Sequence, residues 1–254
     1  VIGKDILRFH AVYWPAFLLA ANLPLPKRVF GHGWILSEDK KMSKSIGNIL
    51  DPIEIIESYG IDQLRYYLVK EVSLGNDGSI SMENLKNCVN NDLANNYGNL
   101  CQRVFSFLKK NCDNKIPTKY NLNEVDKKLL DNLKNNLPKL INLMDNHNLN
   151  EYIKIVVSFS FDANKYFNDL EPWAVKKKDP DRMKTILFTI SEQIKNISIL
   201  LSPIIPNATN KVLNTMNISN DQIGIDKIND TNILNHEKEL NNLDILFTKI
   251  EDDN

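Results

Sequence analysis

The stretch from Lys41 to Ser45, which reads KMSKS, is the part of this chain best suited to chemistry. Two lysines stand three residues apart, hydroxyl side chains lie between and after them, and Gly47 follows. These residue types favour a loop over a strand or a helix interior. Two point charges with several hydroxyls match the oxygens of a polyphosphate. For an isolated K-x-x-K, a solvated lysine loop is the simpler explanation.

Other motifs stand in a fixed order around this loop. They are GKDILRFH at 3–10, WPA at 14–16, HG at 32–33 and EPW at 171–173. With the lysine loop, this order resembles the methionyl-tRNA synthetase family, a class I aminoacyl-tRNA synthetase family, over essentially the whole chain. The runner-up is a class I synthetase for another apolar amino acid. The leucine, isoleucine and valine enzymes share the lysine loop but differ around Lys4 and His10.

The resemblance implies a methionine–tRNA ligase. Such an enzyme forms methionyl-adenylate from methionine and ATP, with Mg²⁺, and transfers the methionyl group to tRNA(Met), including the initiator tRNA. Negative charge grows on the leaving pyrophosphate, so Lys41 and Lys44 are the expected catalytic residues, and Lys44 is the stronger candidate. The methionine carboxylate is the nucleophile, so no side chain needs to be one.

The expected ATP site includes residues on both sides of the loop. The residues are Gly3, Asp5, His32, Ile35, Lys41, Met42, Ser43, Lys44 and Ser45. Asp5 follows a predicted strand end, where ligands of parallel α/β sheets collect, and it could hold the ribose hydroxyls or simply cap a helix. By the resemblance His10 borders the methionine pocket, although a lone histidine among apolar residues is usually a core residue. We interpret Trp14 as core.

The resemblance also implies recognition of the CAU anticodon. Asn95, Asn99 and Arg103 are spaced at i, i+4 and i+8, which puts them on one face of a helix. Amide and guanidinium groups suit base edges, and Trp173 after Pro172 suits stacking on a base. The alternatives are a solvated helix face for the stripe and a bundle-core position for Trp173.

The predicted fold is mainly α: the C-terminal remnant of a Rossmann-type α/β catalytic domain, followed by an all-α anticodon-binding helix bundle. The expected divisions are 1–50 for the catalytic remnant, 51–85 for a connecting segment and 86–254 for the helical domain. A family signature, H-x-G-H, does not occur in the sequence. We therefore expect the chain to be inactive by itself.

Local signals give the elements. Near the start, they predict a strand end at Ile2, a helix over 5–21 with a kink at Pro15, and one buried strand over 29–36. Asp51, Pro52 and Gly60 bound a helix, and Asp62 starts the next. The helices expected after that are 81–111, 123–145, 149–170, 181–202 and 207–216, then an irregular 217–235 and a last helix over 237–250. Gly98 weakens the first of these by roughly 1 kcal/mol relative to alanine.

Composition limits the remaining choices. The net charge of −1 over 254 residues argues against a chain that is basic overall, so RNA contacts must be local. The three cysteines are too far apart for a zinc knuckle, and we expect no metal in this segment. We also expect a monomeric, cytoplasmic protein without membrane contact. A stand-alone tRNA-binding module and a helical adaptor remain alternatives; a pure binding module has no need for a complete lysine loop.

Overall fold

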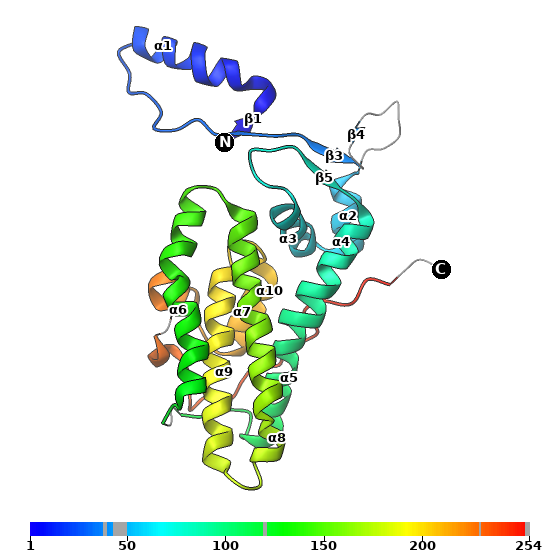
Figure 1. Ribbon diagram of the computed structural model, residues 1–254, viewed down its shortest axis with the longest axis vertical. Helices are drawn as coiled ribbons and strands as arrows, with labels where there is room; N and C mark the ends of the chain where they lie inside the picture. Colours follow the sequence, from blue (N-terminus) through cyan, green and yellow to red (C-terminus); the bar gives the residue numbers. More distant parts are fainter. Residues whose placement is uncertain (38–39, 43–49, 119–120, 229, 252–254) are drawn as a thin grey trace.

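The computed structural model describes residues 1–37, 40–42, 50–118, 121–228 and 230–251. It has two parts of different build (Figure 1). A small part with short strands and one helix stands at one end of an elongated bundle of long helices. The predicted mainly α fold, with a remnant of an α/β domain before a helical bundle, is confirmed.

The first strand and its crossover follow the prediction closely. Strand β1 (Ile2–Gly3) pairs in parallel with β2 (Gly31–His32). Between them, the chain is helical throughout residues 4–20, with three segments that differ in winding. These are a 3₁₀ turn η1 (Lys4–Ile6), a π-helical turn η2 (Phe9–Tyr13) and helix α1 (Trp14–Ala20). Pro15 lies just after the π-helical turn, and its missing N–H coincides with the change of winding between η2 and α1.

The single strand expected over 29–36 is wrong. The run is divided at Gly33 into β2 and β3 (Ile35–Ser37), which belong to different sheets. β3 pairs with β4 (Lys40–Lys41) in antiparallel fashion and with β5 (Gly78–Ile80) in parallel. A Cβ at Gly33 would lie 2.2 Å from the backbone carbonyl of Asn76. The close approach of that loop requires glycine and diverts the chain between the two sheets.

Two helices connect the sheets to the bundle. In α2 (Pro52–Tyr59), Asp51 Oδ1 accepts the Ile53 N–H at 2.8 Å, as predicted. Gly60 separates α2 from α3 (Ile61–Glu71) with φ 101° and ψ 152°, a conformation that is open to glycine but lies outside the left-handed helical region.

The prediction that Asp62 caps α3 is also wrong. Asp62 is buried within the first turn, and its Oδ2 accepts the backbone N–H of Ala208 at 2.7 Å. Ala208 lies in the first turn of a distant helix, α10 (Pro206–Thr215). The carboxylate therefore caps α10 from α3 and fastens the connecting segment to the bundle.

The long helix predicted over 81–111 is present, and we call it the rod. Its hydrogen-bonding pattern changes from α to π and back to α along its length. Ser81 Oγ accepts the Asn84 N–H, and helix α4 (Met82–Cys88) continues as a π-helical segment η3 (Val89–Gly98) and then as α5 (Asn99–Asn111). Along this rod, Leu93, Tyr97, Leu100 and Val104 are buried, whereas Phe107 is only partly buried. Segments of π-helix are rare and often occur at functional sites.

The other predicted helices occur within one residue of their expected bounds. They are α6 (Glu124–Asp145), α7 (Leu149–Leu170), α9 (Pro180–Leu201) and α10. A short helix α8 (Pro172–Val175), which was not predicted, lies between α7 and α9. Helix α9 lies at the centre of the bundle, and every residue from Thr185 to Leu201 is buried. The main hydrophobic core forms around it.

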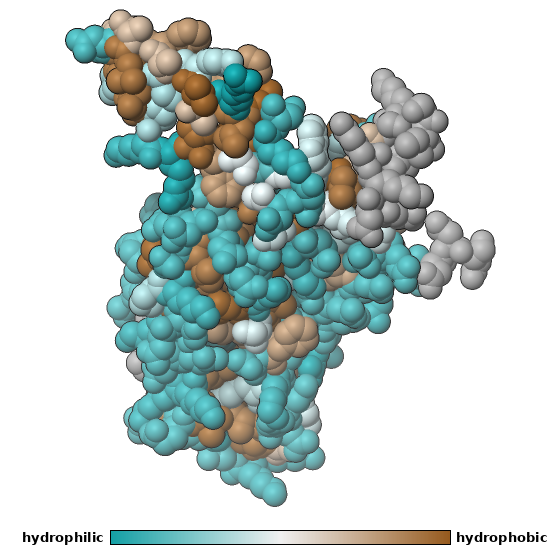
Figure 2. Space-filling view, turned by 45° about the horizontal axis from the view of Figure 1, so that its top comes forward, coloured by the Kyte–Doolittle hydropathy of each residue, from teal (hydrophilic) through white to brown (hydrophobic). Residues whose placement is uncertain are grey.

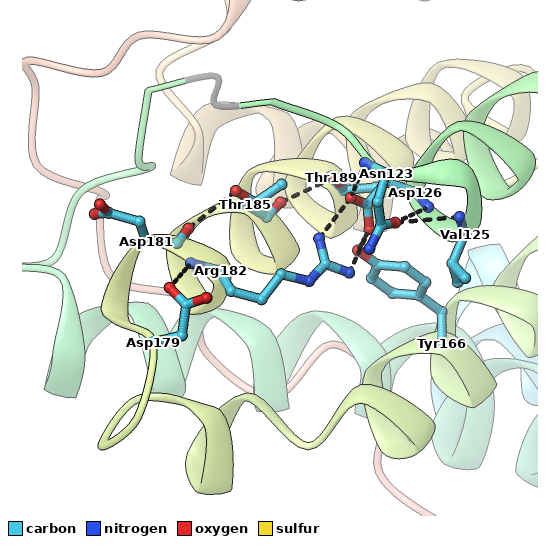
Figure 3. Close-up of polar contacts among 9 residues, drawn as sticks. All are labelled: Asn123, Val125, Asp126, Tyr166, Asp179, Asp181, Arg182, Thr185 and Thr189. Carbon is cyan, nitrogen blue, oxygen red and sulfur yellow. Dashed lines mark hydrogen bonds and ion pairs between the residues drawn. The ribbon is translucent and has the colours of Figure 1, made fainter.

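A buried carboxylate joins three of these helices (Figure 3). Asp126 of α6 accepts hydrogen bonds from the Tyr166 hydroxyl of α7 at 2.6 Å and from both terminal nitrogens of Arg182 of α9 at 2.5 and 2.8 Å. Its Oδ2 also accepts the backbone N–H of Asn123, which completes a capping box. Burial by itself would raise the pKa of Asp126, but the hydrogen bonds from Arg182, Tyr166 and Asn123 hold it below its ordinary value.

The chain ends in a different way from the prediction. After α10 the described residues form three short 3₁₀ turns, η4 (Asn220–Gln222), η5 (Ile225–Lys227) and η6 (Thr231–Ile233). The helix expected over 237–250 is wrong, because this stretch is irregular and lies along the bundle. Side-chain amides of the bundle bond its backbone groups, which in a helix would bond one another.

Candidate functional site

The pairing of β1 with β2 brings together two of the residues predicted to bind nucleotide. Gly3 and His32 are register partners in this pair, and His32 Nδ1 lies 2.8 Å from the Gly33 carbonyl. A Cβ on Gly3 would come within 2.5 Å of Asp5 Oδ1. Glycine therefore leaves room for the Asp5 carboxylate, which is exposed in the turn after β1. Gly3, Asp5 and His32 meet at one end of the small sheet.

A further residue, Asp77, fastens this end of the sheet to β3 and β5. Its Oδ1 lies 2.5 Å from Lys4 Nζ and accepts the Trp34 backbone N–H at 2.7 Å. The hydrogen bond from Lys4 lowers the pKa of Asp77. Sequence reasoning missed this residue. Its only signal was an N-D-G turn before a short strand.

Ile35 lies close to the same end, on β3. Together with His32 it lines a cavity of about 200 Å³ whose other walls include Leu68, Val69 and Val72. The lining is mostly apolar, which suits a flat ring better than a phosphate. The structure thus brings His32 and Ile35 to one cavity.

Only the first two residues of the lysine loop, Lys41 and Met42, belong to the part of the chain that the structure describes. Lys41 belongs to β4, where it is the register partner of Leu36. Met42 is partly buried and packs against the core, so it anchors the start of the loop. Ser43, Lys44 and Ser45 lie outside the described residues, and so does Gly47.

His10 is held within its own segment. Its Nδ1 lies 3.0 Å from the Ile6 carbonyl, and its ring meets Trp14 edge-on with centroids 6.3 Å apart. Trp14 has 43% of its surface exposed, so the interpretation of Trp14 as a core residue is wrong. It belongs to a wide exposed apolar face of the small part, which is visible in Figure 2 and includes Phe9 and Phe17.

On the rod, two of the predicted anticodon residues converge on one aromatic ring. The Arg103 guanidinium lies over the Phe167 ring, 5.2 Å from its centroid, and its Nη2 donates to Asn168 Oδ1 at 2.7 Å. Trp173 meets the same ring edge-on at 5.7 Å and is 40% exposed. Phe167 itself is almost fully buried. These contacts fix the planes of a guanidinium and an indole at the surface.

The left-handed conformation of Glu171 makes this arrangement possible. Its φ of 41° and ψ of 61° end α7 and start α8, so Pro172 turns inward and becomes buried while Trp173 stays at the surface. Sequence reasoning found Trp173 but missed Phe167. The only available signal was an aromatic residue about one helical turn before the E-P-W motif.

Asn95 and Asn99 lie nearer the start of the rod than Arg103 does. Both are exposed, and both line a cavity of about 330 Å³ with Ile245, Leu246 and Lys249 of the chain's last segment. Gln102 and Arg103 are neighbours about 100° apart around α5, and each is about one turn from Asn99. Gln102 bonds the last segment, whereas Arg103 contacts α7. Asn99 therefore lies between the two contacts.

The described residues contain no group of three or more His, Cys, Asp or Glu side chains able to hold a metal ion. Cys88 and Cys101 are buried free thiols, and burial raises the pKa of Cys88 to about 12. Among the helices described, none has both the length and the apolar content to cross a membrane.

Comparison with known families accounts for almost the whole chain. Residues 1–105 match the family described as tRNA synthetases class I (M), and residues 116–254 match the anticodon binding domain of methionyl tRNA ligase. A methionine–tRNA ligase from Brucella suis biovar 1 (strain 1330) is 46% identical over 222 residues, which cover 87% of this chain and 43% of that protein. Its counterpart from Rickettsia felis (strain ATCC VR-1525 / URRWXCal2) is 42% identical over 231 residues, which cover 89% of this chain and 44% of that protein.

Solved structures agree with these sequence matches. Mycobacterium tuberculosis methionyl-tRNA synthetase bound by methionyl-adenylate superposes with a TM-score of 0.91 at 36% identity, over 97% of this chain and 49% of that one. Its free state gives a TM-score of 0.90 at 32% identity. The chain thus spans about half the length, or less, of the relatives that it matches.

Proposed function

The chain belongs to the methionyl-tRNA synthetase family of class I aminoacyl-tRNA synthetases, and from that premise we propose that it serves in charging tRNA(Met). The reaction is ATP-dependent formation of methionyl-adenylate, followed by transfer of the methionyl group to the tRNA. ATP enters with Mg²⁺. The divisions that we propose are a catalytic portion over 1–50, a connecting segment over 51–85 and an anticodon-binding portion over 86–254.

In adenylate formation, we assign the lysine loop to the pyrophosphate. Lys41 and Lys44 place positive charge where negative charge grows on the leaving group, and Ser43 and Ser45 donate hydrogen bonds to the same oxygens. The chain alone should not catalyse ATP–pyrophosphate exchange, because the H-x-G-H segment does not occur in it. Clear exchange activity by the purified chain would show that the ATP site lies elsewhere.

The end of the β1–β2 sheet is the proposed site for the nucleoside. The Asp5 carboxylate holds the ribose hydroxyls, and Gly3 lets the backbone come close to the nucleotide. His32 and Ile35 line an apolar cavity of a kind that suits adenine. We assign His10 to the border of the methionine pocket.

In the helical part, we propose that Asn95, Asn99, Arg103 and Trp173 read the CAU anticodon. The observation that carries this proposal is the convergence of Arg103 and Trp173 on the Phe167 ring. A guanidinium and an indole held in fixed planes at the surface provide stacking platforms for unstacked bases. The amides of Asn95 and Asn99 present donors and acceptors for base edges.

The test is binding of initiator tRNA to this chain at one fixed salt concentration, compared with the same tRNA whose CAU anticodon has been changed. A large loss of affinity is expected on changing the anticodon. The same measurement on Trp173→Ala tests the contribution of the indole to anticodon binding. Phe161→Ala is its matched control, because Phe161 is an exposed aromatic residue on α7. Equal affinity for both tRNAs would leave only charge-based contacts and would contradict anticodon reading.

The second candidate is a stand-alone tRNA-binding module. The finding that favours it is that the bundle has its own buried core around α9. The chain can be mixed with the half of a relative that it does not match. If it binds tRNA(Met) specifically but the mixture never catalyses ATP–pyrophosphate exchange, the module is the better description. Restored exchange would favour the ligase.

We also propose that the protein is a monomer located in the cytoplasm.

A further inference from the structure

The last described segment of the chain, residues 239–251, is held along the rod by side-chain amides. Asn114 Nδ2 donates to the Leu240 carbonyl at 2.8 Å, and Gln102 Nε2 donates to the Asp244 carbonyl at 2.8 Å. Near the end, Asn90 makes two bonds with the backbone of Ile250: its Nδ2 donates to the carbonyl at 2.9 Å, and its Oδ1 accepts the N–H at 2.8 Å. We call residues 239–251 the C-terminal strap.

An apolar contact fixes the strap between the last two of these bonds. Phe247 is buried, and its ring lies against Gly98, where an added Cβ would be 3.4 Å from Phe247 Cδ2. The position of the strap is therefore set by side-chain hydrogen bonds to its backbone and by the packing of the Phe247 ring. A segment fixed in this way can present its other side chains in defined places.

Those other side chains point to the face that bears the predicted anticodon residues. Ile245 is 68% exposed and Lys249 is exposed, and both line the 330 Å³ cavity with Asn95 and Asn99. Within the part of the chain that the structure describes, Lys249 takes part in no ion pair. The cavity thus combines amides, a cation and an apolar side chain, and its size is in the range of small-ligand pockets (~300–1,000 Å³).

The exposed face of α5 is then the floor between two walls. Arg103, Phe167 and Trp173 form one side, and the strap forms the other, with Gln102 joined to it. Single-stranded RNA needs both stacking surfaces for its bases and cations for its backbone. The first wall supplies the stacking surface, whereas Lys249 supplies a cation on the second.

We propose that the strap is the second wall of the RNA groove, where Lys249 contacts a phosphate of the anticodon loop and Ile245 contacts the adjacent sugar or base. This inference rests on the proposed function, and it adds a binding element far from Arg103 in sequence. The ligand is the single-stranded loop of tRNA(Met).

The experiment measures the affinity of the 254-residue chain for a labelled anticodon stem-loop carrying CAU, over a series of salt concentrations. Lys249→Gln should weaken binding about threefold or more, as for an exposed ionic contact. It should also lower the slope of log Kd against log salt by about 0.7, the value for one contact to a single strand. Lys238→Gln is the matched control, because Lys238 is an exposed lysine directly before the strap and outside the cavity. It should leave both quantities unchanged.

Two further variants distinguish the effect of the strap's position from the effect of the Lys249 charge. Ile245→Ser should weaken binding without changing the salt slope. Asn90→Ala, which removes both bonds to Ile250, should reproduce the effect of Lys249→Gln while the bundle keeps its thermal unfolding midpoint. If Lys249→Gln behaves like Lys238→Gln while the wild-type chain still discriminates CAU from a changed anticodon, the strap proposal alone is overturned. Loss of discrimination by the wild-type chain would overturn both proposals.

Discussion

The ring of Phe247 packs against Gly98, so the C-terminal strap contacts the π-helical part of the rod. An added Cβ at position 98 would lie 3.0 Å from the Leu93 carbonyl oxygen and 3.4 Å from Phe247 Cδ2. Glycine in a helix interior costs roughly 1 kcal/mol relative to alanine. At position 98, glycine leaves room for the Phe247 ring, which belongs to a segment distant in the sequence.

The first prediction is that Gly98→Val releases the C-terminal strap. The β-branched side chain must displace the Phe247 ring and press on the Leu93 carbonyl, so residues 246–250 should exchange amide hydrogens faster. Chymotrypsin should also cleave faster after Phe247, which is only 6% exposed in the native chain. Asn91→Val is the control, because Asn91 is an exposed residue of the same π-helical segment. Unchanged exchange in Gly98→Val would show that the strap does not depend on this contact.

The second prediction concerns the buried carboxylate of Asp126. Asp126→Asn should lower the free energy of unfolding by about 3–5 kcal/mol, because it leaves Arg182 without its anionic partner in a largely buried position. Urea denaturation measures this loss. Asp131→Asn, an exposed change on the same helix, should cost less than about 0.5 kcal/mol. Similar losses for the two variants would show that the network contributes little.

The third prediction is a pH dependence of stability that comes from the same residue. The pKa of Asp126 is below its ordinary value of 3.8 in the folded chain, so the unfolded chain binds the proton first as pH falls. The contribution of Asp126 is complete above the unfolded pKa and is lost as pH falls through the folded pKa. The difference in unfolding free energy between wild type and Asp126→Asn should therefore shrink from pH 6 to pH 3. A constant difference would contradict the assignment.

Much of the helical fold could be predicted from local signals. Asp51 and Ser81 mark predicted helix starts that the structure confirms, because capping residues act on their own neighbours. Asp62 misled the prediction for the opposite reason. Its carboxylate caps α10, and the pairing of two helices distant in sequence leaves no local trace.

The last segment shows the same limit. The apolar residues of 237–250 suit a helix, but the amides of Asn90, Gln102 and Asn114 bond its backbone and hold it extended. For the candidate site, the sequence motifs led to Asp5, His32, Arg103 and Trp173. Phe167 and Asp77, which position these residues, belong to no motif and were found only from their contacts.

The fourth prediction concerns the exposed apolar face of the small part. Phe9 and Phe17 are 60% and 70% exposed, and a face of this kind binds hydrophobic dyes and promotes association. The double variant Phe9→Ser, Phe17→Ser should bind less ANS and remain monomeric at higher concentration, while the bundle unfolds at the same temperature. Phe161→Ser, on the bundle, is the control and should change ANS binding little. Equal ANS binding by the double variant and wild type would place the dye-binding surface elsewhere.

The last prediction separates the surface tryptophan from the ring that supports it. Trp173→Ala should weaken binding of the CAU stem-loop by about 1–3 kcal/mol, the usual contribution of one stacked base. Because Trp173 is 40% exposed, its removal should cost less unfolding free energy than Phe167→Ala, for which about 3–5 kcal/mol is expected at 2% exposure. Binding titrations and urea denaturation on the same preparations give the two quantities.

The comparison of the two variants decides between two roles for Trp173. A residue that binds RNA loses affinity with little loss of stability, whereas a residue of the bundle core loses both together. Arg103→Lys adds an independent check, because lysine keeps the charge but has no planar group to lie on Phe167. It should weaken discrimination between CAU and a changed anticodon while leaving the salt slope of binding unchanged. If Trp173→Ala instead costs as much stability as Phe167→Ala and leaves the affinity intact, Trp173 is a packing residue and the anticodon surface must lie elsewhere.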